Sequence, residues 1–130
     1  MPDLFWRWVF WFKGAWNCIL SAGAAFLDPL SRTRLGMPQV DPLYRWSFLA
    51  LAFIFGIGYL RVGNDLSRRE IVILGILAQL STFAIFTYYF CLGKMYLLYY
   101  IPGGVVDLIF AVLFTAFLID KYRKAPQTPS

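Results

Sequence analysis

Hydrophobic residues in this chain fall into four long runs, and short stretches rich in polar residues, glycine or proline separate one run from the next. The runs cover about residues 4–27, 43–61, 68–91 and 97–120. An apolar helix needs about 20 residues to cross the hydrocarbon layer of a membrane. The pattern therefore predicts a single all-α domain over 1–130, an integral membrane four-helix bundle of up-down topology, with a polar C-terminal tail at 121–130 that need not be ordered.

Two polar motifs predict where helices begin. Asp41 followed by Pro42 is typical of an N-cap residue with proline in the first helical turn, which starts the second run. Ser67 and Glu70 have the spacing of a capping box, in which the two side chains satisfy opposite backbone donors. The third helix is therefore expected to begin near Arg68. Met95–Tyr100 either starts the fourth helix or lies along the membrane interface before Pro102.

The composition excludes several kinds of function. The chain has 60% hydrophobic and 15% charged residues, and its net charge of +5 comes from lysines and arginines outside the apolar runs. A nucleic-acid partner would need a basic surface with exposed aromatic residues, which this pattern does not provide. The sequence holds no histidine. This removes histidine-ligated haem, histidine metal sites and Ser/His or Cys/His catalysis, so we expect no enzyme, no metal and no cofactor.

Cys18 and Cys91 are the two cysteines. Their positions in the first and third runs place them at different depths, and a disulfide needs Cα atoms within about 7 Å. Two buried free thiols are therefore expected. In the second run, Gly56 and Gly58 supply small residues against which another helix can pack closely.

The first run opens with the aromatic segment Phe5–Phe12. Such a segment is typical of the membrane interface, where the rings lie in lipid and the indole N–H groups reach the headgroups. A stacking platform for a ligand is the functional alternative. The small residues of 21–25, after a basic and apolar stretch, also leave open a signal peptide that is cleaved.

The distribution of basic residues predicts the orientation in the membrane. Seven lysines and arginines flank the runs on the side that holds both termini, against four on the other side. The seven are Arg7, Arg61, Arg68, Arg69, Lys121, Arg123 and Lys124. We therefore expect a multi-pass protein of the inner (plasma) membrane with cytoplasmic N- and C-termini.

Asp107 interrupts the last apolar run, and a carboxylate inside a bilayer costs about 3 kcal/mol unless it has a partner, water or a cavity. Residue counts at about 1.5 Å per position place Lys13, Asn17 and Gln79 near its depth. We therefore predict that Asp107 pairs with Asn17, Lys13 or both, with Gln79 beside them. Three roles fit this cluster: hydrogen bonds that hold helices together, a pocket for the polar head of a lipophilic molecule, or a proton or substrate pathway. The pathway lacks a histidine or second buried carboxylate.

The order of four spans resembles that of the DoxX-like small bacterial membrane proteins. The resemblance covers about residues 4–120 and includes Arg45 with aromatic residues at the start of the second span. It also includes the segments Leu51–Tyr59 and Gly104–Phe114. It implies an up-down four-helix bundle, often associated with membrane redox systems, and no catalytic residue carries over. Small multidrug transporters also have four spans, but they place an essential glutamate in the first span, where this chain has Lys13.

These observations lead to two hypotheses of function. The first is an accessory or interaction subunit of a membrane complex, in contact with membrane lipids and with other subunits or copies of itself. Its helices hold a lipid or quinone-like molecule at Asp107, Lys13, Asn17 and Gln79. The second is a small transporter or permease in which Asp107 is the charged site inside the membrane.

Overall fold

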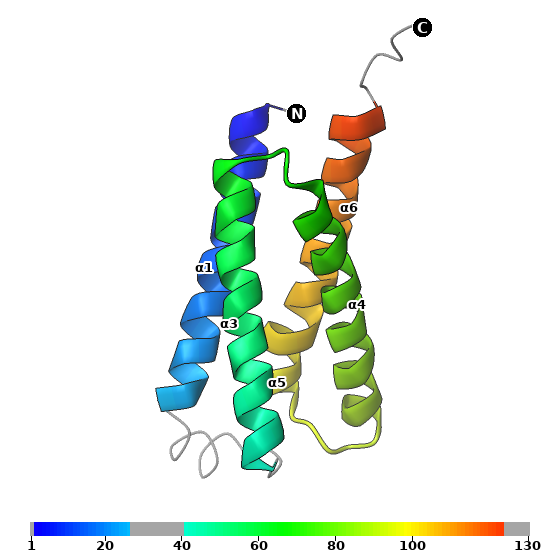
Figure 1. The fold of residues 1–130 in the computed structure, drawn as a ribbon. Helices are drawn as coiled ribbons and strands as arrows, with labels where there is room; N and C mark the ends of the chain where they lie inside the picture. Colours follow the sequence, from blue (N-terminus) through cyan, green and yellow to red (C-terminus); the bar gives the residue numbers. More distant parts are fainter. Residues whose placement is uncertain (1, 27–40, 124–130) are drawn as a thin grey trace, which may run out of the picture.

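A computed structural model describes residues 2–26 and 41–123, and within them the fold is all-helical. The long helices α1 (Asp3–Phe26), α3 (Pro42–Asn64) and α4 (Arg69–Cys91) run in alternating directions. The last helix has three parts: α5 (Leu97–Tyr100), the π-helical turn η1 (Ile101–Val105) and α6 (Val106–Arg123). The prediction of an all-α chain with four helices in up-down order is confirmed (Figure 1).

The helix bounds differ from the expected ones by a few residues. The second helix continues to Asn64 and the last to Arg123, three residues past each expected end. The last helix begins at Leu97, so the segment before Pro102 is helical instead of lying along an interface. The polar connection before Asp41 and the tail after Arg123 lie outside the described residues.

Both predicted helix starts are correct to within one residue, but only one of the two predicted caps forms. Asp41 caps α3, because its carboxylate accepts a hydrogen bond from the Leu43 backbone N–H at 2.8 Å. The capping box of Ser67 and Glu70 is wrong. The Ser67 hydroxyl and backbone N–H both donate to Asp65 Oδ1, at 2.6 and 3.1 Å, and α4 begins after Arg68 without a side-chain cap. The nearby carboxylate therefore competes successfully for the serine.

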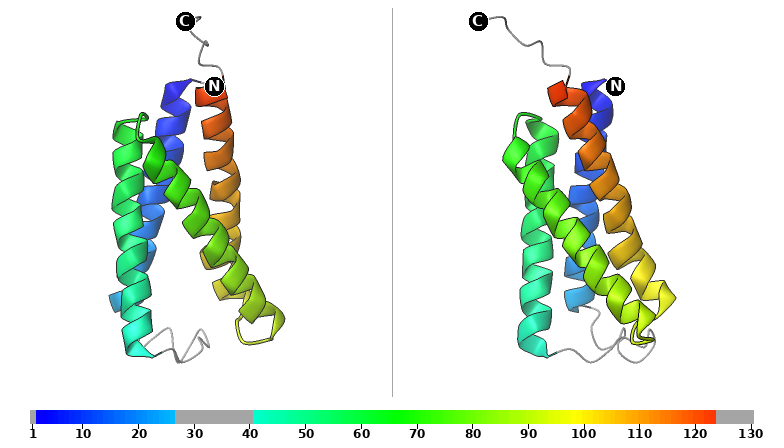
Figure 2. Two further views of the ribbon diagram at one scale, coloured as in Figure 1. Left: turned by 45° about the vertical axis from the view of Figure 1, so that its right-hand side comes forward. Right: turned by 90° about the vertical axis from the view of Figure 1, so that its right-hand side faces the viewer.

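The helices form two pairs, α1 with α3 and α4 with α6 (Figures 1 and 2). We call the end where α1 begins and α6 ends the near end, and the end where α3 begins and α5 lies the far end. A short turn joins α3 to α4 at the near end, and α4 inclines away from α3 toward the far end (Figure 2). The two pairs are therefore closest to one another at the near end.

The buried apolar core occupies the near half of the molecule. It consists of Trp6, Phe10, Tyr59, Val62, Leu66, Val72, Phe110, Phe114 and Phe117. Residues of the far half that turn toward the other pair remain partly exposed, as Phe86 does on α4. Ring contacts still cross the far half, with centroids 6.1 Å apart both for Phe48 and Phe86 and for Phe86 and Tyr99. The packing thus becomes looser from the near end to the far end.

Two glycines allow α1 and α3 to approach closely. A Cβ atom on Gly56 would lie 2.9 Å from the Gly14 carbonyl oxygen and 2.7 Å from Cys18 Sγ. A Cβ atom on Gly14 would lie 2.8 Å from the Gly56 carbonyl oxygen. The predicted close packing at Gly56 is therefore confirmed, and the backbones of the two helices meet where both lack a side chain.

Three helices are long and apolar enough to cross a membrane: α3, α4 and the continuous helix Leu97–Arg123. Helix α1 has 24 residues but contains charged, amide and indole side chains among its apolar ones. Large apolar side chains are exposed along the outward faces of the helices, including Ile54 on α3, Leu77 on α4 and Val112 on α6, at 59, 58 and 61%. A bundle of this size in water does not expose so much continuous apolar surface.

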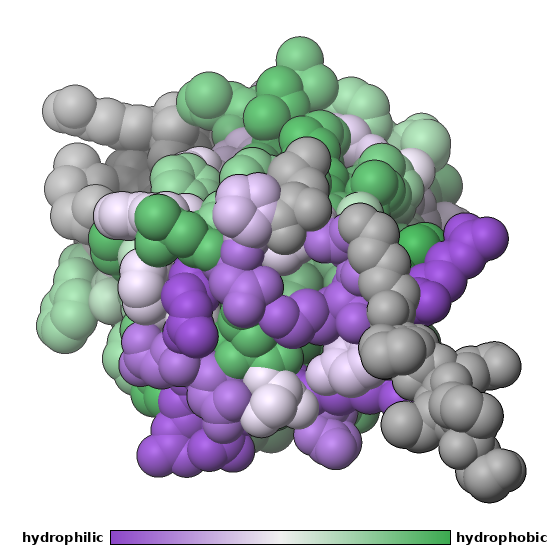
Figure 3. Space-filling model, turned by 90° about the horizontal axis from the view of Figure 1, so that it is seen from above, coloured by the Kyte–Doolittle hydropathy of each residue, from purple (hydrophilic) through white to green (hydrophobic). Residues whose placement is uncertain are grey.

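Hydrophilic residues gather at the near end, which Figure 3 shows from above. The α3–α4 turn and the helix ends beside it contribute four exposed residues: Arg61, Asp65, Arg68 and Arg69. The hydrogen bonds from Ser67 hold the pKa of the Asp65 carboxyl below its usual value, and the nearby Arg68 and Arg7 act in the same direction. The near end therefore carries a group of exposed charged side chains.

Candidate functional site

The candidate site is a buried ion pair between α1 and the start of α6. Lys13 lies in the middle of α1, ten residues after its first residue, and its side chain is fully buried. Asp107 lies ten residues after Leu97, where the last helix begins. At about 1.5 Å per residue, both are roughly 15 Å from the end at which their helix begins. The two helices run in opposite directions, so these residues meet at mid-depth.

The two side chains are in direct contact. Lys13 Nζ donates to Asp107 Oδ1 at 2.5 Å, and the ammonium also lies 5.4 Å from the centre of the Phe110 ring. The Lys13 side chain is 0% exposed, whereas that of Asp107 is 17% exposed. The Asp107 side chain is thus still partly accessible. A charged pair in such a place is retained only when each group satisfies the other, because a lone buried charge is very unfavourable.

The π-helical turn η1 precedes Asp107 and positions its helix. Gly103 and Gly104 lie in this turn against α4, where a Cβ atom on Gly103 would overlap the Phe86 ring. A π turn contains one residue more than an α turn, so it rotates the helix that follows about its axis. The turn therefore sets which face of α6 carries Asp107 toward Lys13.

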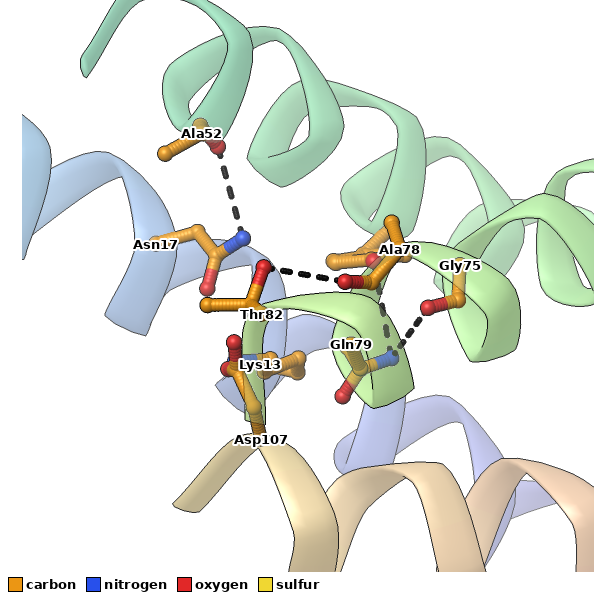
Figure 4. A network of polar contacts seen from close by, with 9 residues as sticks. Lys13, Asn17, Ala52, Gly75, Ala78, Gln79, Thr82 and Asp107 are labelled. Carbon is orange, nitrogen blue, oxygen red and sulfur yellow. Dashed lines mark hydrogen bonds and ion pairs between the residues drawn. The ribbon is translucent and has the colours of Figure 1, made fainter. Parts of the chain in front are cut away.

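Gln79 extends into the same interior from α4 (Figure 4). It is 3% exposed, and its Nε2 donates to the Gly75 carbonyl at 3.1 Å and to the Tyr59 hydroxyl at 3.5 Å. Its Oε1 has no hydrogen-bond partner within the described residues. Tyr59 comes from α3 and is 1% exposed. All four long helices thus contribute a side chain to the buried region around the ion pair.

Asn17 does not take the predicted place beside Asp107. Its Nδ2 donates to the Ala52 carbonyl of α3 at 3.3 Å, so it stabilises the α1–α3 pair (Figure 4). The reason is geometric, since α1 packs closely on α3 along its length and Asn17 lies next to Gly56. The structure therefore forms the predicted pair of Asp107 with Lys13 and does not form the one with Asn17.

Polar contacts close the near end between α1 and α6. Trp6 Nε1 donates to the Asp120 carboxylate at 3.1 Å, and Lys121 Nζ lies 2.7 Å from Asp3 Oδ1. The Trp6 ring packs edge-on against Phe117 with centroids 5.5 Å apart. The ion pair of Lys13 and Asp107 therefore lies at the boundary between a packed, cross-linked near half and a more open far half.

The chemistry of this site is that of hydrogen bonding and charge. Within residues 2–26 and 41–123, no three His, Cys, Asp or Glu side chains are grouped as metal ligands would be. Cys18 and Cys91 are free thiols, as expected. The expected burial of Cys91 is wrong, because this residue ends α4 where the helix leans outward, and it is exposed.

Sequence reasoning missed Tyr59 and the contact of Trp6 with Asp120. A tyrosine in the middle of an apolar span is a signal, because a buried hydroxyl needs a partner. Trp6 and Asp120 lie at equivalent depths from the near end, but helix neighbours cannot be assigned from depth alone. The contacts of Tyr59 and of Trp6 depend on which faces of the helices meet. The hydrophobic pattern of the apolar runs does not show which faces these are.

Comparisons with protein-family models, with curated proteins and with solved structures found no match to this chain. The resemblance to DoxX-like proteins stays a prediction. The function must accordingly be argued from the site.

Proposed function

We propose that this chain is a four-span membrane protein of the inner membrane whose interior holds the polar head of a lipophilic molecule. We further propose that it acts as a non-enzymatic accessory or interaction subunit of a membrane complex. Support for the membrane location comes from the three apolar helices and from α1, which packs along α3 and so lies at the same depth. The more basic near end fits the cytoplasmic side.

The observation that carries the proposal is the asymmetry of the buried ion pair. Lys13 is fully buried, while the Asp107 side chain is 17% exposed at mid-depth. A purely structural role does not require a buried ion pair. Apolar residues of similar volume at these two positions would stabilise the helix contact as well or better. A partly open carboxylate beside an ammonium offers both an acceptor and a local dipole to a polar head.

The apolar part of such a ligand would lie along the far half. Thr82, Phe83 and Phe86 continue the face of α4 that carries Gln79, and all three are only half-buried. The phenylalanine rings can contact an acyl or prenyl chain and need no hydrogen-bond partner. The head would therefore lie at the ion pair and the tail would extend toward the far end.

Purification in mild detergent tests the proposal. The full chain is compared with the double variant Lys13→Met/Asp107→Leu, which removes both charges and leaves neither unpaired. Glu70→Gln, on the exposed surface of α4, is the matched control for loss of a carboxylate. Mass spectrometry then identifies co-extracted lipophilic molecules and co-purifying subunits.

We expect the wild-type chain and Glu70→Gln to retain the same lipophilic molecule in near-stoichiometric amount, and the double variant to lose it. The same lipid content in all three proteins would contradict a ligand role for the ion pair. Wild-type protein that copurifies with no other membrane protein would contradict the accessory role.

A small transporter is the second candidate, and the closed near end is the observation that favours it. The contacts Trp6–Asp120 and Asp3–Lys121 join α1 to α6 on the near-end side of the ion pair, while the far half is looser. A site closed on one side and open on the other is the resting geometry of alternating access. Uptake or drug resistance that depends on Asp107, in cells lacking any partner complex, would favour this candidate over the accessory subunit.

A further inference from the structure

Gln79 Oε1 is a buried acceptor whose donor is missing from the described residues. An amide oxygen away from water and without a hydrogen bond is costly, and nearly all such groups in folded proteins have a partner. Gln79 is 3% exposed, so bulk solvent does not supply this donor. The unused acceptor therefore indicates a donor group outside the described residues.

Exchanging the two ends of the amide does not remove the problem. In the present orientation Nε2 donates to the Gly75 carbonyl at 3.1 Å (Figure 4). The reverse orientation would place Oε1 against the Gly75 carbonyl oxygen, two acceptors with no proton between them. The carbonyl of Gly75 thus fixes the amide, and Oε1 is turned away from it.

Tyr59 supplies the complementary half of the site. Its hydroxyl accepts from Gln79 Nε2 at 3.5 Å and makes no second hydrogen bond within the described residues. The phenol proton therefore has no acceptor among the described residues. A group that donates to Gln79 Oε1 and accepts from Tyr59 satisfies both, and a hydroxyl does this with a single oxygen atom.

We infer that the lipophilic molecule in this bundle carries a hydroxyl head, which donates to Gln79 Oε1 and accepts from Tyr59. The inference rests on the proposed function and narrows it, since it selects hydroxyl-bearing lipids over ethers and esters of the same size. Lys13 and Asp107 lie in the same interior and orient the hydroxyl by their charge. A hydrogen bond to an otherwise unsatisfied buried acceptor favours the donor ligand by roughly tenfold in affinity.

Two photoactivatable probes of equal length test this inference: a diazirine-bearing long-chain alcohol and its methyl ether. The full chain is reconstituted in nanodiscs of phosphatidylcholine, a lipid without hydroxyl groups. Labelling is mapped by mass spectrometry, and competition with unlabelled dodecanol or its methyl ether gives the affinities. We expect both probes to label the interior of α3 and α4, and the alcohol to bind roughly tenfold tighter than the ether.

Gln79→Met keeps the length of the side chain and removes the acceptor, so the preference for the alcohol should fall to about one while binding of the ether is unchanged. The change also removes the Nε2 donor to the buried Tyr59 hydroxyl, so a modest loss of stability is expected in the absence of alcohol. Thr82→Val is the matched control, because the Thr82 hydroxyl on the same helix already donates to the Ala78 carbonyl at 2.9 Å. This variant should keep the preference.

The outcomes separate the two proposals. Equal affinity of alcohol and ether for the wild-type chain would overturn the hydroxyl inference and leave the lipophile site standing, with water as the donor to Gln79. Labelling of the outer faces alone, with no competition by either compound, would overturn the lipophile site itself. If Gln79→Met does not fold, Gln79→Leu and the wild-type affinity ratio still decide the question.

Discussion

Lys13 Nζ and Asp107 Oδ1 lie 2.5 Å apart and join the first and last helices at mid-depth, although 94 positions separate them in the chain. Ring contacts accompany this ion pair between the same helices, with centroids 5.9 Å apart for Phe12 and Phe110 and 4.5 Å apart for Phe10 and Phe114. This ion pair therefore fixes how the α1–α3 pair docks on the α4–α6 pair at the level of the candidate site.

Removal of one charge of this pair should be worse than removal of both. Asp107→Leu leaves a buried ammonium without a partner and should lower the free energy of unfolding by about 3 kcal/mol. Lys13→Met combined with Asp107→Leu should recover part of that loss. Thermal unfolding in detergent of the wild type, both single variants and the double variant measures the coupling, and strictly additive effects would show that the two sites are independent.

The Trp6–Asp120 contact predicts a second stability effect at the near end. Trp6→Phe keeps a ring against Phe117 but removes the indole donor to the carboxylate, which should cost about 1 to 2 kcal/mol. Hydrogen exchange of the last turns of α6 should become faster. Trp8→Phe is the control, because Trp8 is 62% exposed. Equal effects of the two variants would mean that the hydrogen bond to Asp120 contributes nothing.

The helices could be predicted from the sequence because long apolar runs are separated by short polar stretches, and three of the four runs form helices with the length and apolar content of a membrane span. The pairing of Lys13 with Asp107 also followed, since two opposite charges at one depth inside an apolar bundle have few other partners. Asn17 shows the limit of that reasoning. It lies one turn from Lys13 on α1, yet it bonds to Ala52, because the rotation of each helix about its axis decides its partner.

The rotation of the last helix could not be predicted for a second reason. The π turn η1 contains one residue more than an α turn and so rotates Asp107 about the helix axis relative to the residues before the turn. The residue pattern of 101–105 does not predict this extra residue. Tyr59 and the unused acceptor of Gln79 depend on that arrangement as well. The sequence therefore predicted the depth of the buried polar residues, whereas their hydrogen-bond partners had to be read from the structure.

Close packing at Gly56 predicts a steric effect. Gly56→Ala places a methyl group against Cys18 Sγ and the Gly14 carbonyl and should destabilise the α1–α3 pair by about 1 to 3 kcal/mol. Gly23→Ala on α1 is the matched control, since a Cβ atom there meets nothing within 4 Å. That change should be neutral or stabilise by up to about 1 kcal/mol. Unfolding in detergent compares the two, and equal destabilisation would argue against a tight helix contact.

Asp65 predicts the pH dependence of the near-end turn. Its pKa is lowered from the usual 3.8 chiefly by the Ser67 hydroxyl and backbone N–H. The turn is therefore stabilised by this group above pH 3.8, and the stabilisation is lost as the pH falls through the lowered pKa. Ser67→Ala should raise the pKa of Asp65 toward the usual value, whereas Ser67→Thr should not. NMR titration of the carboxyl measures this, and no change in Ser67→Ala would be the contrary result.

Cys91 and Glu70 lie at opposite ends of α4 and are both exposed, so they test the proposed crossing of the membrane. In a Cys18→Ala background, a membrane-impermeant maleimide should label Cys91 from the periplasmic side of intact spheroplasts. With Cys91→Ala in addition, a cysteine introduced by Glu70→Cys should be labelled only after permeabilisation. Cysteines introduced at positions 30–40 should likewise be labelled from outside, and cysteines beyond Lys124 should not. Both sets of positions lie outside the described residues. The reverse pattern would invert the orientation, and labelling of both from one side would show that α4 does not cross the membrane.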